Sequence, residues 1–162
     1  MKRNMIITVI LLVLLITTYL MNGVSSSLDA RTSEEAIAIS LIREKISINK
    51  ILKLDHFHGE KKWWIVWGID GNDRPFAGWV EGQNVSIDDT TSKPPPSYFS
   101  DFVVNQNSLR KIIRVTPGVV HDIKVWEVFY KELTSKGYAY HYAYFKWKNS
   151  EPIETYQLAV SK

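Results

Sequence analysis

The sequence contains no cysteine among its 162 residues. This absence excludes disulfide bonds, thiol catalysis, thiolate metal sites and a lipid-modified cysteine. A domain without disulfides has to be stabilised by its core, and 45% of the residues are hydrophobic, with six Trp and eight Tyr among them. Buried aromatic side chains contribute large apolar areas. The composition is therefore sufficient for a core that needs no covalent cross-link.

The sequence also lacks a strong excess of either charge. Its net charge is +3, but Lys2 and Arg3 stand before the apolar run of residues 5–21. Without those two, 18 of the 20 basic residues remain against 17 acidic ones. A nucleic-acid-binding protein needs a clustered basic face. We therefore expect no nucleic-acid partner.

The common catalytic signatures are missing as well. No Gly-rich phosphate loop, G-x-S-x-G or H-E-x-x-H pattern occurs. Residues 47–50 read S-I-N-K and match the S-x-x-K motif of penicillin-binding proteins. In those enzymes the motif opens a helix and needs further S-D-N and K-T-G motifs, whereas here it closes a predicted helix and has no such companions. We predict that the chain is not an enzyme and has no cofactor.

One pair of histidines has metal-ligand spacing. His56 and His58 point to the same side of a predicted strand, and Glu60, His121 or Asp122 would be needed as a third ligand. No cluster of carboxylates or further histidines flanks the pair. Two exposed histidines near a turn are the better interpretation, so we predict no metal site.

The longest apolar run favours a membrane anchor. Residues 5–21 are seventeen uncharged residues, and a membrane-spanning helix needs about 20. Lys2 and Arg3 favour a cytoplasmic N-terminus. The alternative is a signal peptide cleaved near residues 24–26, but its apolar region is about 7–15 residues long. We predict a single-pass cell-membrane protein whose C-terminal domain is extracellular, with residues 1–24 as the anchor.

Beyond the anchor, the pattern predicts an α+β protein made of two tandem units, residues 25–92 and 93–162. Each unit has one helix, packed on an antiparallel sheet of three or four strands. The first helix starts at Thr32 as N-cap and closes near Asn49, and the second starts at Ser97. Turns are expected at residues 117–118 and at the other Gly- or Pro-containing separators. The expected strands are 51–58, 62–70, 75–81, 85–88, 109–116, 123–131, 138–147 and 153–160.

Aromatic strands are the best candidates for a binding surface. Residues 138, 140, 142 and 144 are all Tyr, and they alternate with Ala139, His141, Ala143 and Phe145. Small alanines suit the face beneath a helix, which leaves the tyrosines on the open side. Tyr and Trp are enriched in protein interfaces, although such faces can also bury each other between the two units. The candidate interaction residues are Trp63, Trp64, Trp67, Trp79, Trp126, Tyr138, Tyr140, Tyr142 and Tyr144.

Three of the expected strands carry a resemblance to a known family. Residues 125–130 read VWEVFY, residues 137–144 continue with a Gly and the alternating tyrosines, and residues 62–68 read KWWIVWG. Together with an anchor and two helix-plus-sheet units, they resemble the YpmB-like proteins of Gram-positive bacteria. These form the cell wall elongation regulator TseB-like family, which is related to PepSY domains and to the cystatin-like fold.

The resemblance implies a fold and a function. It implies two cystatin-like units and a regulator or adaptor of cell-wall elongation that binds a penicillin-binding protein or another membrane-anchored wall-synthesis protein. One alternative is a PepSY-like inhibitor or chaperone of an extracellular peptidase. A further alternative is a cell-wall glycan-binding module that stacks sugars on its Trp faces.

Overall fold

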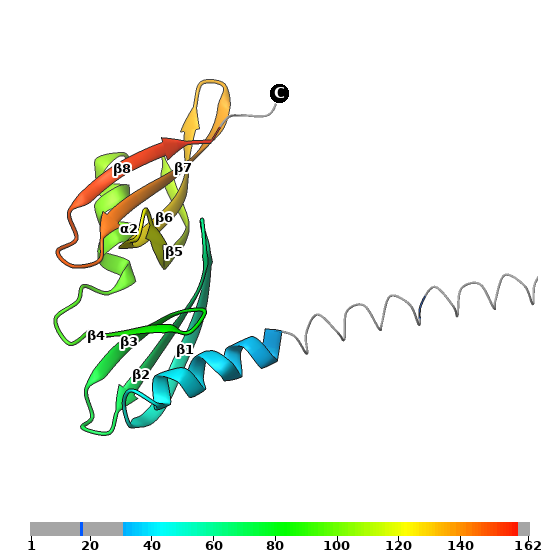
Figure 1. Ribbon diagram of the computed structural model, residues 1–162. Coiled ribbons are helices and arrows are strands. Elements are labelled where there is room, and N and C mark those ends of the chain that lie inside the picture. Colours follow the sequence, from blue (N-terminus) through cyan, green and yellow to red (C-terminus); the bar gives the residue numbers. More distant parts are fainter. Residues whose placement is uncertain (1–16, 18–30, 159–162) are drawn as a thin grey trace, which may run out of the picture. The chain divides into compact units, whose positions relative to one another are not determined.

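The computed structural model describes residue 17 and residues 31–158 (Figure 1). The predicted anchor, apart from Thr17, lies outside these residues. No helix in the described part of the chain has both the length and the hydropathy of a membrane span. The chain divides into two compact units, Met1–Ser40 and Leu41–Lys162. The predicted divisions at residues 24 and 92 stay predictions.

The Leu41–Lys162 unit contains two four-stranded sheets, and in each the strand order follows the sequence. All neighbouring strands are antiparallel. Two helices, over residues 31–43 and in α2, complete the described elements, so the predicted α+β class is confirmed. Sheet A comprises β1 (Ile48–His58), β2 (Lys62–Asp70), β3 (Pro75–Glu81) and β4 (Asn84–Asp89). Sheet B follows α2 (Pro96–Gln106) and comprises β5 (Arg110–Val120), β6 (Ile123–Thr134), β7 (Gly137–Lys146) and β8 (Pro152–Gln157).

The bounds of the first helix differ from those predicted. Residue 31 is already helical, so Thr32 lies inside the helix, and the helix ends at residue 43 instead of near Asn49. The residues after it join sheet A, because the Ser47 carbonyl accepts a hydrogen bond from Gly71 N at 2.9 Å. The Asn49 amide donates to Asp73 across the sheet at 3.0 Å. Pairing with a distant hairpin therefore overrides the local helical pattern.

Helix α2 packs on sheet B through its buried residues Phe99 and Val103, which are one helical turn apart. The ring of Phe99 lies 5.2 Å from that of Trp126 and 5.3 Å from that of Phe145, measured between centroids. The helix starts at Pro96, where the missing N–H of proline leaves no intrahelical bond unmade. The three consecutive prolines therefore set the start of this helix.

Indole rings fill the space between the two sheets. Trp67 of β2 and Trp79 of β3 meet Trp126 of β6 and Trp147, which follows β7. The ring centroids are 4.9 Å apart for Trp79 and Trp147, 5.0 Å for Trp126 and Trp147, and 5.8 Å for Trp67 and Trp126. Trp79 and Trp126 are 0% and 1% exposed. The two sheets therefore share one aromatic core.

The turn predicted at Pro117 and Gly118 is wrong, because both residues lie inside β5. The turn that follows is formed by His121 and Asp122, whose φ angles of 49° and 59° fit a tight hairpin. Proline is tolerated in β5 because this strand is at an edge of its sheet. Gly118 is needed because the Phe57 ring lies against it: an added Cβ would be 2.4 Å from Phe57 Cε2.

We predict that Gly118→Ala lowers the free energy of unfolding by about 1–3 kcal/mol, because the added methyl group overpacks against a buried ring. Phe57 is 8% exposed and has little room to move away. Urea unfolding of Gly118→Ala, Phe57→Ala and the double variant measures this. The losses of stability from the two substitutions should be less than additive, since Phe57→Ala removes the ring against which the added methyl group clashes. Additive costs would show that the contact is not the reason for glycine.

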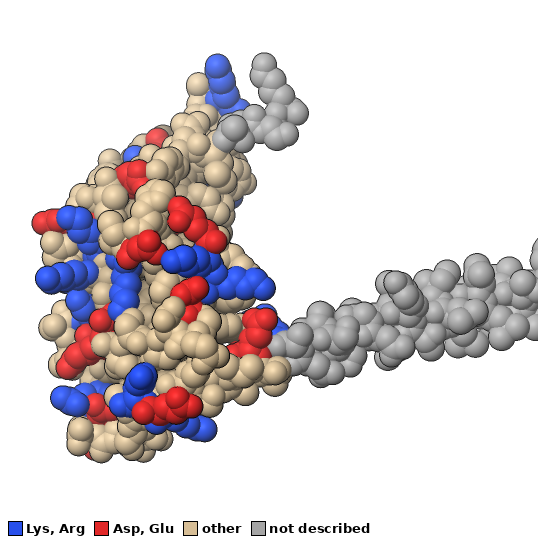
Figure 2. Space-filling model, viewed as in Figure 1, with Lys and Arg blue, Asp and Glu red and all other residues tan. Residues whose placement is uncertain are grey.

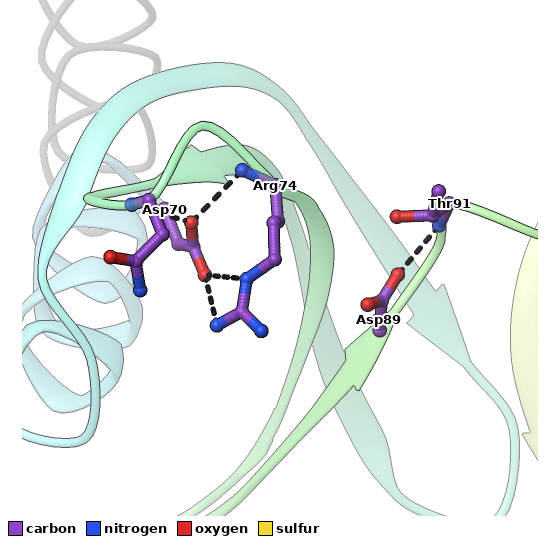
Figure 3. A network of polar contacts seen from close by, with 5 residues as sticks. Asp70, Arg74, Asp89 and Thr91 are labelled. Atoms are coloured by element: carbon purple, nitrogen blue, oxygen red, sulfur yellow. Dashed lines mark hydrogen bonds and ion pairs between the residues drawn. The ribbon is translucent and has the colours of Figure 1, made fainter.

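A carboxylate closes the hairpin between β2 and β3 (Figure 3). Asp70 Oδ1 accepts hydrogen bonds from the backbone N–H groups of Asn72 and Arg74 at 2.8 and 3.0 Å, and Oδ2 accepts from the Arg74 guanidinium at 2.9 and 3.1 Å. These bonds, the Arg74 N–H first among them, lower the pKa of Asp70. Nearby, Asp89 accepts from Thr91 N at 2.7 Å. Both turns are thus held by side chains that mimic backbone acceptors.

We predict that Asp70→Asn lowers the melting temperature at pH 7, because the variant loses the ion pair with Arg74. A carboxyl group whose pKa is lowered by folding stabilises the protein above its unfolded pKa of about 3.9 and loses this effect as the pH falls through the folded pKa. The difference in Tm between wild type and variant should therefore shrink below about pH 4. A difference that stayed constant down to pH 2 would contradict the assignment.

Candidate functional site

The side of sheet B that faces away from α2 carries the four alternating tyrosines, as predicted. Ala139 and Ala143, both 5% exposed, lie on the opposite side together with Phe145, whose ring contacts Phe102 of α2. We call the first side the open face. By strand register it includes Lys111, Arg114, Thr116, Glu127, Phe129, Lys131, Leu133, Tyr138, Tyr140, Tyr142, Tyr144, Glu154 and Tyr156.

Aromatic rings lie in a row across the open face, which we call the tyrosine row. Its members are Phe129, Tyr138, Tyr140, Tyr142, Tyr144 and Tyr156. Phe129 stacks on Tyr142 with centroids 4.6 Å apart and on Tyr140 at 6.0 Å, and Tyr142 stacks on Tyr144 at 6.4 Å. Tyr138 is 48% exposed and Tyr140 is 39% exposed. The row is therefore held in place by its own contacts while a large part of its apolar surface stays in water.

Basic side chains lie beside this row. Lys131 Nζ is 4.1 Å from the centroid of the Tyr138 ring, and the guanidinium of Arg114 is 5.9 Å from that of Phe129. Both distances are within the range of cation–π attraction. On the side of the molecule shown in Figure 2, Lys and Arg are interspersed with Asp and Glu. On this side, charge recognition therefore has to come from local groups.

One end of the open face is hollowed into a cleft of about 490 Å³. The C-terminal end of β1 and the following turn form one wall, and β5, β6 and β7 form the rest. The side chains that give the cleft its chemistry are His56, His58, Arg114, Glu127, Tyr142 and Tyr144. Both the size and the mixture of aromatic and polar groups are typical of ligand-binding clefts.

A buried carboxylate organises this cleft. Glu127 is 5% exposed, and its Oε1 accepts a hydrogen bond from Arg114 Nη2 at 2.7 Å. Its Oε2 accepts from the Tyr144 hydroxyl at 3.3 Å. Burial, and then the negative charge of Glu127, raise the pKa of Tyr144, so this phenol keeps its proton and acts as the donor. Glu127 thereby fixes both a guanidinium and a phenol at the cleft.

The two histidines share one side of β1, as their spacing predicted. Their ring centroids are 3.9 Å apart, and His56 also stacks on Trp64 at 4.2 Å. Glu60 Oε1 lies 3.1 Å from His121 Nδ1. Within residues 31–158, no three His, Asp or Glu side chains are grouped so that they could hold a metal ion. The geometry therefore offers no reason to assign a metal to this pair.

The predicted tryptophans lie mainly in the core. Trp64, Trp79 and Trp126 are buried, and Trp63 and Trp67 are partly buried against the core. This outcome corresponds to the alternative in which aromatic faces bury each other, and it leaves the tyrosines as the accessible members of the set. The sequence patterns did not reveal Arg114, Glu127 or Phe129, because only the register of β5 and β6 brings them to the tyrosines.

Comparison with known proteins identifies the fold. No protein-family model and no curated protein matches the sequence. Among solved structures, the YpmB protein from Bacillus subtilis matches with a TM-score of 0.63 and 15% sequence identity, over 76% of this chain and 96% of that chain. This chain has the YpmB fold. The resemblance predicted from the aromatic strands is thus confirmed at the level of the fold.

We predict that Arg114→Met lowers the free energy of unfolding by about 1–3 kcal/mol, because Glu127 is left buried without its charged partner. The larger loss of stability that follows when a fully buried ion pair is broken does not apply, since the Arg114 side chain is 52% exposed. The double variant Arg114→Met, Glu127→Met should regain most of this loss in urea unfolding. A double variant less stable than Arg114→Met alone would contradict this prediction. It would show that Glu127 stabilises the fold even without Arg114 as its partner.

Proposed function

We propose that this chain is a non-enzymatic adaptor of cell-wall elongation that binds a penicillin-binding protein through the open face of sheet B. In this proposal residues 1–24 keep the chain in the cell membrane, and the Leu41–Lys162 unit works outside the cell. We further propose that the two helix-plus-sheet units predicted from the sequence, residues 25–92 and 93–162, belong to the TseB-like, PepSY-related group with a cystatin-like fold. The likeness to YpmB supports the assignment through the fold alone.

The observation that carries the proposal is the uncovered tyrosine row. Tyr138, Tyr140 and Tyr156 are between 39% and 48% exposed, although they lie on a sheet whose other side is packed under α2. Exposed aromatic patches with polar surroundings are typical of protein-binding sites. The fold has no use for this apolar surface in its own core, so a partner is its best explanation.

The row is also suited to binding because it is already ordered. Phe129, Tyr140, Tyr142 and Tyr144 restrict one another by stacking. A partner that covers them pays little additional side-chain entropy, which otherwise costs about 0.5–1.5 kcal/mol for each immobilised side chain. The polar groups of the cleft at the end of the row then provide orientation.

We predict that the double variant Tyr138→Ala, Tyr140→Ala reduces recovery of the penicillin-binding protein with the full-length chain about tenfold. Two half-exposed tyrosines at an interface contribute on the order of 1–2 kcal/mol together. The measurement is co-purification from crosslinked membranes, followed by quantification of the transpeptidase.

The control is Tyr98→Ala on α2, since Tyr98 is 48% exposed like Tyr138 but lies outside the open face. It should leave recovery unchanged. Equal recovery with the folded double variant would contradict the proposal. Slower cleavage by a secreted peptidase upon addition of the purified chain would support the peptidase-inhibitor alternative instead.

A further inference from the structure

Two lysines face each other on the open face. Lys111 of β5 and Lys131 of β6 are directly opposite in the strand register. Like charges at such positions destabilise a sheet. Within the described residues, neither lysine has an ion-pair partner, and the ammonium group of Lys131 lies over the Tyr138 ring. The fold therefore retains a repulsive pair on an already exposed aromatic surface.

The acidic groups of the open face do not neutralise this pair. Glu127 is buried and bonded to Arg114 and Tyr144. Glu154 accepts a hydrogen bond from the Tyr156 hydroxyl on the far edge of the sheet. Arg114, on the same strand as Lys111, has one of its N–H groups bonded to Glu127, and its side chain is 52% exposed. The β5–β6 half of the open face is therefore basic, next to the tyrosine row.

We propose that the open face binds an acidic, extended segment of the protein partner. Carboxylates of this segment lie over Lys111, Lys131 and Arg114, and its apolar side chains lie on the tyrosines. The inference rests on the proposed function in taking the open face as the binding surface, and it adds the chemistry of what is bound. The complementary charge of the partner would remove the repulsion between the two lysines, so binding also relieves a cost of folding.

A protein segment fits this surface better than an anionic membrane. Basic clusters that bind acidic lipids have about 4–8 Lys or Arg residues, whereas the β5–β6 half of the open face has three, Lys111, Arg114 and Lys131. The planar guanidinium of Arg114, held in place by Glu127, matches the geometry of a carboxylate. The flat row of stacked tyrosines is also typical of protein interfaces.

The test uses the full-length chain in phosphatidylcholine nanodiscs and a fluorescein-labelled 12-residue peptide in which Glu and Leu alternate. Anisotropy should show that this peptide binds at least ~10-fold more tightly than its Gln-for-Glu and Lys-for-Glu counterparts. The variant Lys111→Gln, Lys131→Gln should remove most of this preference. Lys45→Gln, an exposed cation outside sheet B, should preserve it.

Equal binding of the three peptides by the wild-type chain would overturn the inference without any variant. So would displacement of the acidic peptide by phosphatidylglycerol vesicles but not by the same amount of phosphatidylcholine vesicles, since the site would then be a lipid site. The proposed function is judged separately: loss of transpeptidase recovery in the Tyr138→Ala, Tyr140→Ala variant can occur with or without a preference for acidic peptides.

Stability provides an independent measurement. Lys111→Glu replaces a repulsive cross-strand pair by an attractive one and should raise the melting temperature by ~1–4 °C, while it weakens binding of the acidic peptide. A variant that gains stability and loses binding would show that the lysines are kept for recognition. A lower melting temperature would show that the pair is not repulsive and would overturn the argument.

Discussion

Contact between indole rings determines how the two sheets of the Leu41–Lys162 unit are held together. Each sheet has four strands, and a unit of that size forms only a marginal core by itself. Trp67, Trp79, Trp126 and Trp147 join the two cores into one. Ion pairs flank this aromatic layer, with Lys124 bound to Asp88 at 2.7 Å. The cleft depends on the same contact, because its histidines come from sheet A and its arginine, glutamate and tyrosines from sheet B.

The two sides of sheet B differ in their burial and in their contribution to stability. Under α2, small alanines and the rings of Phe145 and Trp126 are buried and stabilise the fold. On the open face, tyrosines stay in water and like charges lie opposite each other, at some expense of stability. Proteins commonly accept such costs where a surface has to bind something. The distribution of these features supports the proposal that the open face is a binding surface.

Several elements could be predicted from the sequence because their signals are local. The bounds of β2 and β3 and the alternation of β7 follow from aromatic periodicity and turn residues. The core tryptophans could not be separated from accessible ones, since β2 is covered on both sides and shows no polar alternation. Pro117 and Gly118 are typical turn residues, and the contact that requires Gly118 in a strand, with Phe57, is distant in sequence. Likewise, the irregular register between Ile112 and Arg114 places Lys111 and Arg114 on the same side of β5, although they are three residues apart.

Strand geometry couples the stability of this protein to its candidate surface. Successive side chains of a strand point to opposite sides, so the register that places Ala139 and Ala143 beneath α2 also places Tyr138, Tyr140, Tyr142 and Tyr144 on the open face. A shift of one residue would force four tyrosines under the helix and expose the alanines. The tyrosine row is thus positioned by the core itself, which makes the surface as rigid as the fold beneath it. In the proposed complex, the partner therefore meets a preformed surface.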